Sequence, residues 1–178
     1  MNITLNKNKH INFLLSILAG LILQSCLMYT FSGSSLSKEA KTFSMQPFQS
    51  RVALGPANLS EQLAEKLRME LAQKTKLKEV FSNGDIQFEG IITEFKYTPI
   101  TPRSDDRGAT TSREQLSITV QVSYSNAYDK DFEFSKKQFT QTADKDASTS
   151  RDTEEPGLVE DILKKLIKDI FNASIANW

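Results

Sequence analysis

The segment from Leu116 to Tyr124 constrains the fold most, because its apolar and polar residues alternate strictly. Leu116, Ile118, Val120, Val122 and Tyr124 are separated by single Ser, Thr or Gln residues. Successive side chains of a strand point to opposite faces of its sheet. One face of this strand is therefore expected to pack on a core, while the other meets water or a polar partner.

Two segments have the periodicity of amphipathic helices that would cover such a sheet. In the first, leucines recur every four residues over 59–71, and Asn58 with Glu61 three residues later predicts a capping pair. The second is expected to open at Asp152 and Glu155. Its wide apolar stripe consists of Leu158, Val159, Ile162, Leu163, Leu166, Ile167, Ile170 and Phe171.

Further strands are predicted on both sides of the first helix. Segments 41–48 and 86–97 have strand patterns, a change of phase near Gly90 predicts a bulge or bend there, and 76–81 is compatible with a short strand. Phenylalanines within 132–139 mark a strand that pairs with Leu116–Tyr124 as a hairpin. The expected fold is α+β: two helices packed on one face of a mixed sheet of about four strands.

Two polar segments, 98–114 and 142–153, are predicted to be loops. A loop as long as the first is usually functional or disordered. Its arginines could face an anionic partner, whereas its adjacent aspartates favour plain solvation. These residues are Arg103, Arg107, Arg113, Asp105 and Asp106.

The N-terminal segment has the layout of a bacterial lipoprotein signal. Lys7 and Lys9 precede an apolar run over 11–23, which is too short for a spanning helix, and Cys26 follows. Gln24 departs from the strict motif, which prefers a small residue at that position. The segment as a whole resembles the looser motifs of Bacteroidetes-type bacteria. An ordinary cleaved signal followed by a free thiol is the alternative. We expect residues 1–25 to be the signal peptide, 26–39 a lipidated tether, and 40–178 a single domain.

Processing of this kind would exclude several kinds of chemistry. Cleavage before Cys26 removes 25 of the 178 residues, among them His10, the only histidine, and lipidation uses the only cysteine. The mature chain would have no Ser-His-Asp or Cys-His catalysis, no zinc site built on His or Cys, and no internal disulfide. We expect no cofactor and no metal. With 20 basic and 22 acidic residues left, the chain is not a nucleic-acid binder either.

Several short segments resemble, in order and spacing, the LptE family of lipopolysaccharide-assembly lipoproteins in its Bacteroidetes branch. The resemblance begins at Cys26 with Tyr29–Gly33, and it covers nearly the whole mature chain. The other segments are 41–43, Pro47–Phe48, 74–77, Gly84–Gly90, Leu116–Val120, Asp169–Asn172 and Asn177–Trp178. Gly84–Gly90 is the strongest of them.

The resemblance implies a non-enzymatic protein of the outer membrane, anchored through acyl chains such as palmitate. Its implied partner is an LptD-type β-barrel, whose lumen it fills so that lipopolysaccharide reaches the cell surface. Direct contact with lipopolysaccharide is implied through basic side chains near strand ends and loops. Candidate contacts to the barrel or to lipopolysaccharide are Lys96, Arg103, Arg107, Arg113, Ser117, Thr119 and Gln121. Residues 27–29 lack the acidic run of a surface-export signal, so we expect the periplasmic side.

Two alternatives remain at the level of the sequence. The chain could be a lipoprotein subunit of another envelope machine, for phospholipid transport or barrel assembly. It could also be a carboxylate-based enzyme acting on glycans, which needs two acids about 5 to 10 Å apart in a cleft. Asp105 and Asp106 suit that poorly, because adjacent loop residues point apart.

Overall fold

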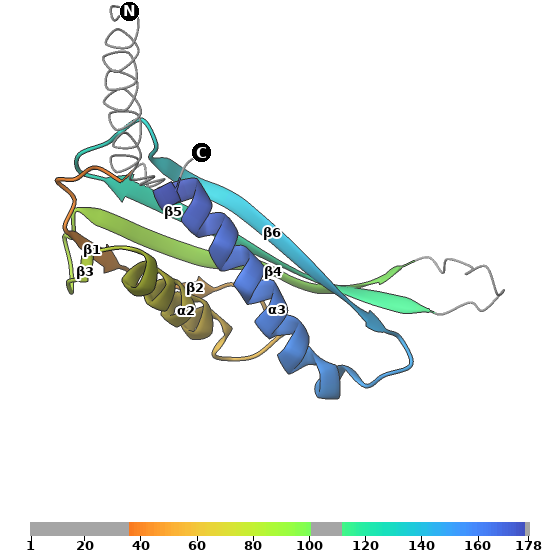
Figure 1. Ribbon diagram of the computed structural model, residues 1–178. Helices are drawn as coiled ribbons and strands as arrows, with labels where there is room; N and C mark the ends of the chain where they lie inside the picture. Colours follow the sequence, from red (N-terminus) through yellow and green to blue (C-terminus); the bar gives the residue numbers. More distant parts are fainter. Residues whose placement is uncertain (1–35, 101–111, 177–178) are drawn as a thin grey trace, which may run out of the picture. The chain divides into compact units, whose positions relative to one another are not determined.

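The computed structural model describes residues 36–100 and 112–176 (Figure 1). Its elements, in chain order, are β1 (Thr42–Met45), β2 (Gln49–Ser50), α2 (Leu59–Lys74), β3 (Lys78–Glu79), β4 (Ile86–Ile100), β5 (Arg113–Asn126), β6 (Phe134–Asp146), α3 (Arg151–Phe171) and a short π-helical turn, η2 (Asn172–Ala176). Within these described ranges, no helix is both long and apolar enough to cross a membrane.

The sheet is mixed and has six strands rather than the four expected. Its order is β3-β1-β4-β5-β6, and β2 also pairs with β4. β4, β5 and β6 are antiparallel to one another, whereas β1 and β2 run parallel to β4. β2 and β3 have two exposed residues each, and β3 lies within segment 76–81, which was compatible with a short strand. Strands so short carry no alternating pattern, which is why β2 was not predicted.

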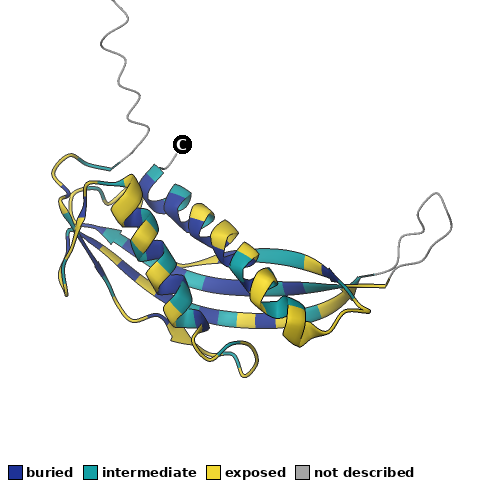
Figure 2. Ribbon diagram, turned by 60° about the horizontal axis from the view of Figure 1, so that its bottom comes forward, coloured by how far each residue is buried: buried dark blue, intermediate teal, exposed yellow. Residues whose placement is uncertain are grey.

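Both helices lie across the same face of the sheet, as predicted (Figure 2). Leu63, Leu67 and Leu71 of α2 are fully buried, and so are Ile162 and Leu166 of α3. Opposite them, the apolar residues of the β5 alternation are buried as well. Each large aliphatic side chain buried in this way contributes roughly 1.5 to 3 kcal/mol, so this helix–sheet layer holds the domain together.

The bulge in β4 lies at Thr93, and the prediction of a bulge at Gly90 was wrong. The register with β5 shifts between Ile92 and Glu94, which leaves Thr93 without a partner in the ladder. Gly90 is regularly paired, but the ring of Phe48 lies against it, and a Cβ there would come within 2.4 Å of that ring. The glycine signal therefore reflected close packing instead of a backbone irregularity.

The long strands extend into segments that were expected to be loops. β4 continues to Ile100 and β5 begins at Arg113, and β6 continues to Asp146. The polar residues of 142–146 concealed the last part of β6, because its ladder continues where apolar alternation has ended. α3 also begins earlier than Asp152, at Arg151.

The expected capping pair at the start of α2 does not form. Asn58 is the N-cap residue, but its side chain makes no cap hydrogen bond. Instead, its Oδ1 accepts a hydrogen bond from Nε2 of Gln62, at 2.8 Å. Glu61 still places a negative charge in the first turn, where the helix dipole favours it.

The Asp85 carboxylate holds the N-terminal part of the domain against the sheet through hydrogen bonds. Its Oδ2 accepts hydrogen bonds from the backbone N–H groups of Lys41 and Thr42, both at 2.9 Å, and from the Thr42 hydroxyl at 2.8 Å. These bonds, led by the one from Lys41, hold the pKa of the Asp85 carboxyl below its ordinary value. We call this end of the domain, comprising residues 36–42, 81–86 and 126–133, the base. The opposite end, comprising 97–100, 113–116 and 143–151, is the hairpin end.

Candidate functional site

The sheet face opposite the helices is the candidate site, and we call it the polar face. The strand register places its residues in rows across β4, β5 and β6. From the base, the rows are Gln87–Ser125, Glu89–Ser123, Ile91–Gln121–Gln138, Glu94–Thr119–Thr140, Lys96–Ser117–Thr142, Thr98–Gln115–Asp144 and Ile100–Arg113–Asp146. Hydroxyl and amide side chains dominate, and charges of both signs are interspersed among them.

Hydrogen bonds between neighbouring strands fix the middle of the polar face. The Thr119 hydroxyl donates to Oε2 of Glu94 at 3.1 Å and lies 2.9 Å from the Thr140 hydroxyl. Two rows further toward the hairpin end, Nε2 of Gln115 donates to Oδ1 of Asp144 at 2.9 Å. The bulge contributes too, because the Thr93 hydroxyl donates to the carbonyl of Thr119 at 3.3 Å. The face is thus arranged before any partner binds it.

Four of the candidate contact residues lie together on this face. Lys96 is the register partner of Ser117, and Thr119 and Gln121 follow on the same strand. Thr119 is buried, with its hydroxyl engaged by neighbours, so it organises the face, whereas Lys96 is exposed and Ser117 and Gln121 are half-buried. These three can contact a partner directly.

The remaining candidates are distributed differently. Arg113 lies in the last row at the hairpin end, where its Nη2 is 3.8 Å from Oδ2 of Asp144. Cys26, Arg103 and Arg107 lie outside the described residues, as do Asp105, Asp106 and the terminal Trp178.

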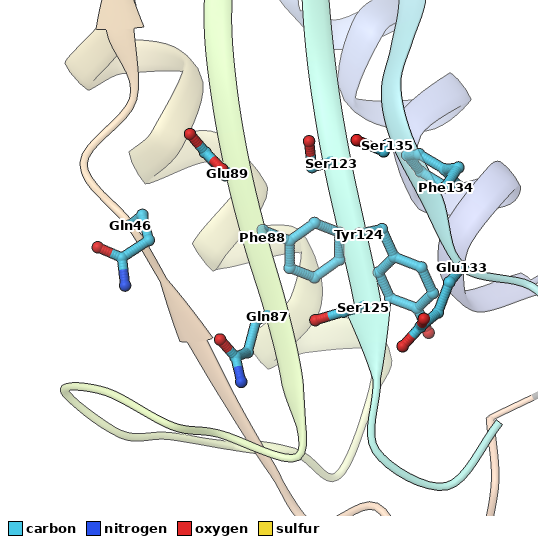
Figure 3. Close-up of a pocket in the computed structure, with 10 residues that line it drawn as sticks. All are labelled: Gln46, Gln87, Phe88, Glu89, Ser123, Tyr124, Ser125, Glu133, Phe134 and Ser135. Carbon is cyan, nitrogen blue, oxygen red and sulfur yellow. The ribbon is translucent and has the colours of Figure 1, made fainter. Parts of the chain in front are cut away.

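A hollow of about 450 Å³ opens on the polar face toward the base (Figure 3). Gln87 and Glu89 of β4 line it together with Ser123 and Ser125 of β5. Its other lining residues are Gln46, Phe88, Tyr124, Glu133, Phe134 and Ser135. No Lys or Arg is among these lining residues, so the hollow suits hydrogen-bonding groups better than phosphates.

A cluster of charged side chains lies at the hairpin end, and it was not predicted from the sequence. Glu114 accepts a paired hydrogen bond from Arg151, with Nη2 at 2.7 Å and Nε at 3.0 Å, and the Arg151 guanidinium lies 4.5 Å from the centre of the Tyr97 ring. The bond from Arg151 keeps the pKa of the Glu114 carboxyl below its ordinary value. Burial, with the hydrogen bond to Glu155, raises the pKa of the Tyr97 hydroxyl.

Lys145 is the buried member of this cluster, with its side chain 1% exposed. Its Nζ donates to the carbonyls of Asp146 and Thr149, at 2.6 and 2.7 Å, and lies 3.6 Å from Oε2 of Glu114. The only sequence signal for it is a lysine on the core-facing register of β6, and that signal was hidden because 142–153 was taken for a loop. Across the described part of the chain, no group of three His, Cys, Asp or Glu side chains is arranged to hold a metal ion.

Similar solved structures include bacterial lipoproteins. Uncharacterized lipoprotein B from Nitrosomonas europaea is 13% identical, with a TM-score of 0.46, covering 74% of this chain and 79% of its own. A minor lipoprotein from Acinetobacter baumannii is 16% identical, with a TM-score of 0.45, covering 74% and 89%. A putative neuraminyllactose-binding hemagglutinin homolog from Helicobacter pylori is 10% identical, with a TM-score of 0.49, covering 80% and 87%.

The sequence comparison gives a more specific result. No curated protein sequence matches the chain. Residues 40–174, however, match the family model LptE, described as lipopolysaccharide-assembly, and this match spans both helices and all six strands. The chain therefore belongs to the LptE family of lipopolysaccharide-assembly proteins.

Proposed function

We propose that this protein is a lipid-anchored outer-membrane subunit that partners an LptD-type β-barrel and fills its lumen. In that position it supports the transport and assembly of lipopolysaccharide. Family membership supports the pathway. The observation that carries the choice of partner is the polar face, which the helices of the domain leave uncovered.

The chemistry of the polar face suits the inner wall of a barrel. Lumens of large outer-membrane barrels are polar, so a surface that fits inside one needs hydrogen-bonding groups more than apolar area. Ser117 and Gln121 supply a hydroxyl and an amide, and their half-buried positions limit the side-chain entropy that binding would cost.

The polar face is also large enough to form most of a stable protein interface. Three strands spaced at about 4.8 Å and running for about 45 Å present roughly 600 Å². Each partner in a stable interface of standard size buries roughly 800 Å². The polar face therefore supplies most of such an interface, and its loops can supply the rest.

Direct binding of lipopolysaccharide is a secondary role in this proposal. Lys96 and Arg113 are the cations on the polar face, but Glu94 and Asp144 lie beside them in adjacent positions. A phosphate-bearing lipid would be bound best by unopposed cations next to an apolar strip. We accordingly assign the polar face to the barrel, and we propose no catalytic role for the protein.

Site-specific photo-crosslinking in the native outer membrane tests this assignment. A crosslinking amino acid at residue 117 or 121 is expected to capture one large β-barrel, identified by mass. The same group at Asp161, exposed on the outer side of α3, probes the opposite side of the domain, which would also face the lumen wall. Capture of no β-barrel at residues 117 and 121 would contradict the proposal. Capture of inner-membrane transporter subunits would favour another envelope machine.

A further inference from the structure

The most exposed aromatic side chains of the described chain lie at one end of the domain. Phe81 is fully exposed at 101%, Tyr128 is 52% exposed and Phe132 is 40% exposed. Phe81 lies in the turn before β4, and the other two lie in the connection between β5 and β6. Single exposed apolar residues are ordinary on protein surfaces, but three aromatic rings on the loops of one end form a shared feature.

Hydrogen bonds tie these loops together at the base. The backbone N–H of Ala127, next to Tyr128, donates to the carbonyl of Asp85 at 2.8 Å. Asp85 also holds Lys41 and Thr42, so the start of the domain joins the same end. The aromatic loops and the point where the chain enters the domain are consequently held next to each other.

The length of chain before the domain limits how far the base can lie from a membrane that holds the anchor. Ten residues separate Cys26 from Leu36, which packs against the core, and ten extended residues span at most about 35 Å. β4 has 15 residues from the base to the hairpin end, a distance of about 45 Å. An anchor at Cys26 thus keeps the base close to the membrane, whereas the hairpin end is free to lie farther away.

We propose that, before a barrel receives the protein, the base docks on the phospholipid surface through Phe81, Tyr128 and Phe132. The inference rests on the lipid anchor of the proposed function and adds a second, protein-borne contact with the membrane. Aromatic side chains are favoured in the headgroup region, where an apolar ring and a polar tip both find suitable surroundings.

The charges of the base indicate that this contact does not depend on anionic lipid. Lys38, Lys41 and Lys130 are mixed with carboxylates such as Asp129 and Asp131, and Lys130 is already paired with Glu133 at 2.8 Å. Such a mixed surface gains little from a negative membrane. Docking is therefore expected on zwitterionic phospholipid as well, with little sensitivity to salt.

Nitroxide labelling of the mature lipoprotein, purified with its own acyl chains, tests the inference. Single cysteines replace one aromatic at a time (Phe81→Cys, Tyr128→Cys or Phe132→Cys), so the other two rings remain. Gly157→Cys is the matched control, because this glycine lies on α3 with open space around a Cβ. The labelled proteins are reconstituted in vesicles of phosphatidylethanolamine and phosphatidylcholine, and collisions with a water-soluble nickel chelate and with molecular oxygen are measured.

The labels at the three base positions are expected to collide with the chelate several-fold less often than the label at residue 157, and with oxygen more often. Equal accessibility at all four positions, or shielding of residue 157 alone, would overturn the inference. The parent chain without an added cysteine tests the anchor separately. If it takes up label, Cys26 is free and membrane docking loses its tether, while the pairing with a barrel is tested by crosslinking.

Discussion

Individual residues of this domain are selected by close packing and by backbone hydrogen bonds more than by local propensity. Gly90 illustrates the first. It lies in the middle of a regular ladder, where glycine is unfavourable, and it is explained only by the Phe48 ring packed against it. Asp85 illustrates the second, since a single carboxylate satisfies two backbone donors from a segment more than 40 positions away.

The packing account predicts opposite effects of two Gly→Ala substitutions. Gly90→Ala places a Cβ within 2.4 Å of the Phe48 ring and is expected to lower the free energy of unfolding by about 1 to 3 kcal/mol. Gly157→Ala meets no atom within 4 Å and is expected to raise it by about 0.5 to 1 kcal/mol through helix propensity. Urea unfolding of both variants measures this, and equal effects would contradict the packing account.

The Asp85 account predicts a dependence on pH. The carboxyl has a folded-state pKa below its ordinary value of 3.8, so its contribution is complete well above pH 3.8 and is lost as pH falls through the folded pKa. Asp85→Asn is therefore expected to be less stable than wild type at pH 7, with the difference shrinking progressively below about pH 5. Denaturant unfolding at several pH values tests this. A difference that stays constant down to pH 3 would show that the charge is not responsible.

At the scale of elements, alternation and helical periodicity could be predicted from the sequence, but the ends of the elements could not. β5 and the stripe of α3 were visible because burial selects apolar residues at a fixed period. β2 and β3 have two residues each, which is too few to show a periodic pattern. The end of β6 is polar, and side-chain hydrogen bonds such as that of Lys145 support it in place of apolar packing. The polar face was predicted as the uncovered side of one strand, whereas its rows required the register of three.

The hairpin end is predicted to depend on Lys145. Lys145→Met keeps an unbranched side chain, one atom shorter, but leaves the carbonyls of Asp146 and Thr149 without their donor, at a cost of about 1 to 3 kcal/mol. Amide hydrogen exchange is expected to accelerate over 143–149 and to stay unchanged over 86–90. Lys164→Met, at an exposed position on α3, is the control. Uniform acceleration in both regions would indicate global destabilisation instead.

The whole molecule is organised around its two ends and one uncovered face. The base contains the start of the described chain, the polar face runs along the three long strands, and the charged cluster lies at the hairpin end. The lipoprotein signal and the family were predicted from short segments of sequence, and the family match over 40–174 confirms the latter. Which side chains contact a partner could not be predicted, because a polar sheet face exposed to water has the same composition.

The anchor is predicted to determine where the molecule resides. Cys26→Ser removes the site of acylation, and the variant is expected to lose retention in the outer membrane because it carries no acyl chains. Fractionation of cells into membrane and soluble parts measures this. Retention of the variant at wild-type levels, with the barrel absent, would contradict lipid anchoring.

The central claim is that the protein partners a single large barrel. Mild-detergent purification of the tagged, full-length protein from its own outer membrane, with bound proteins identified by mass, tests it most directly. The account predicts one large β-barrel recovered in near-equal amount. Recovery of inner-membrane transporter subunits, or of no stable partner, would contradict it.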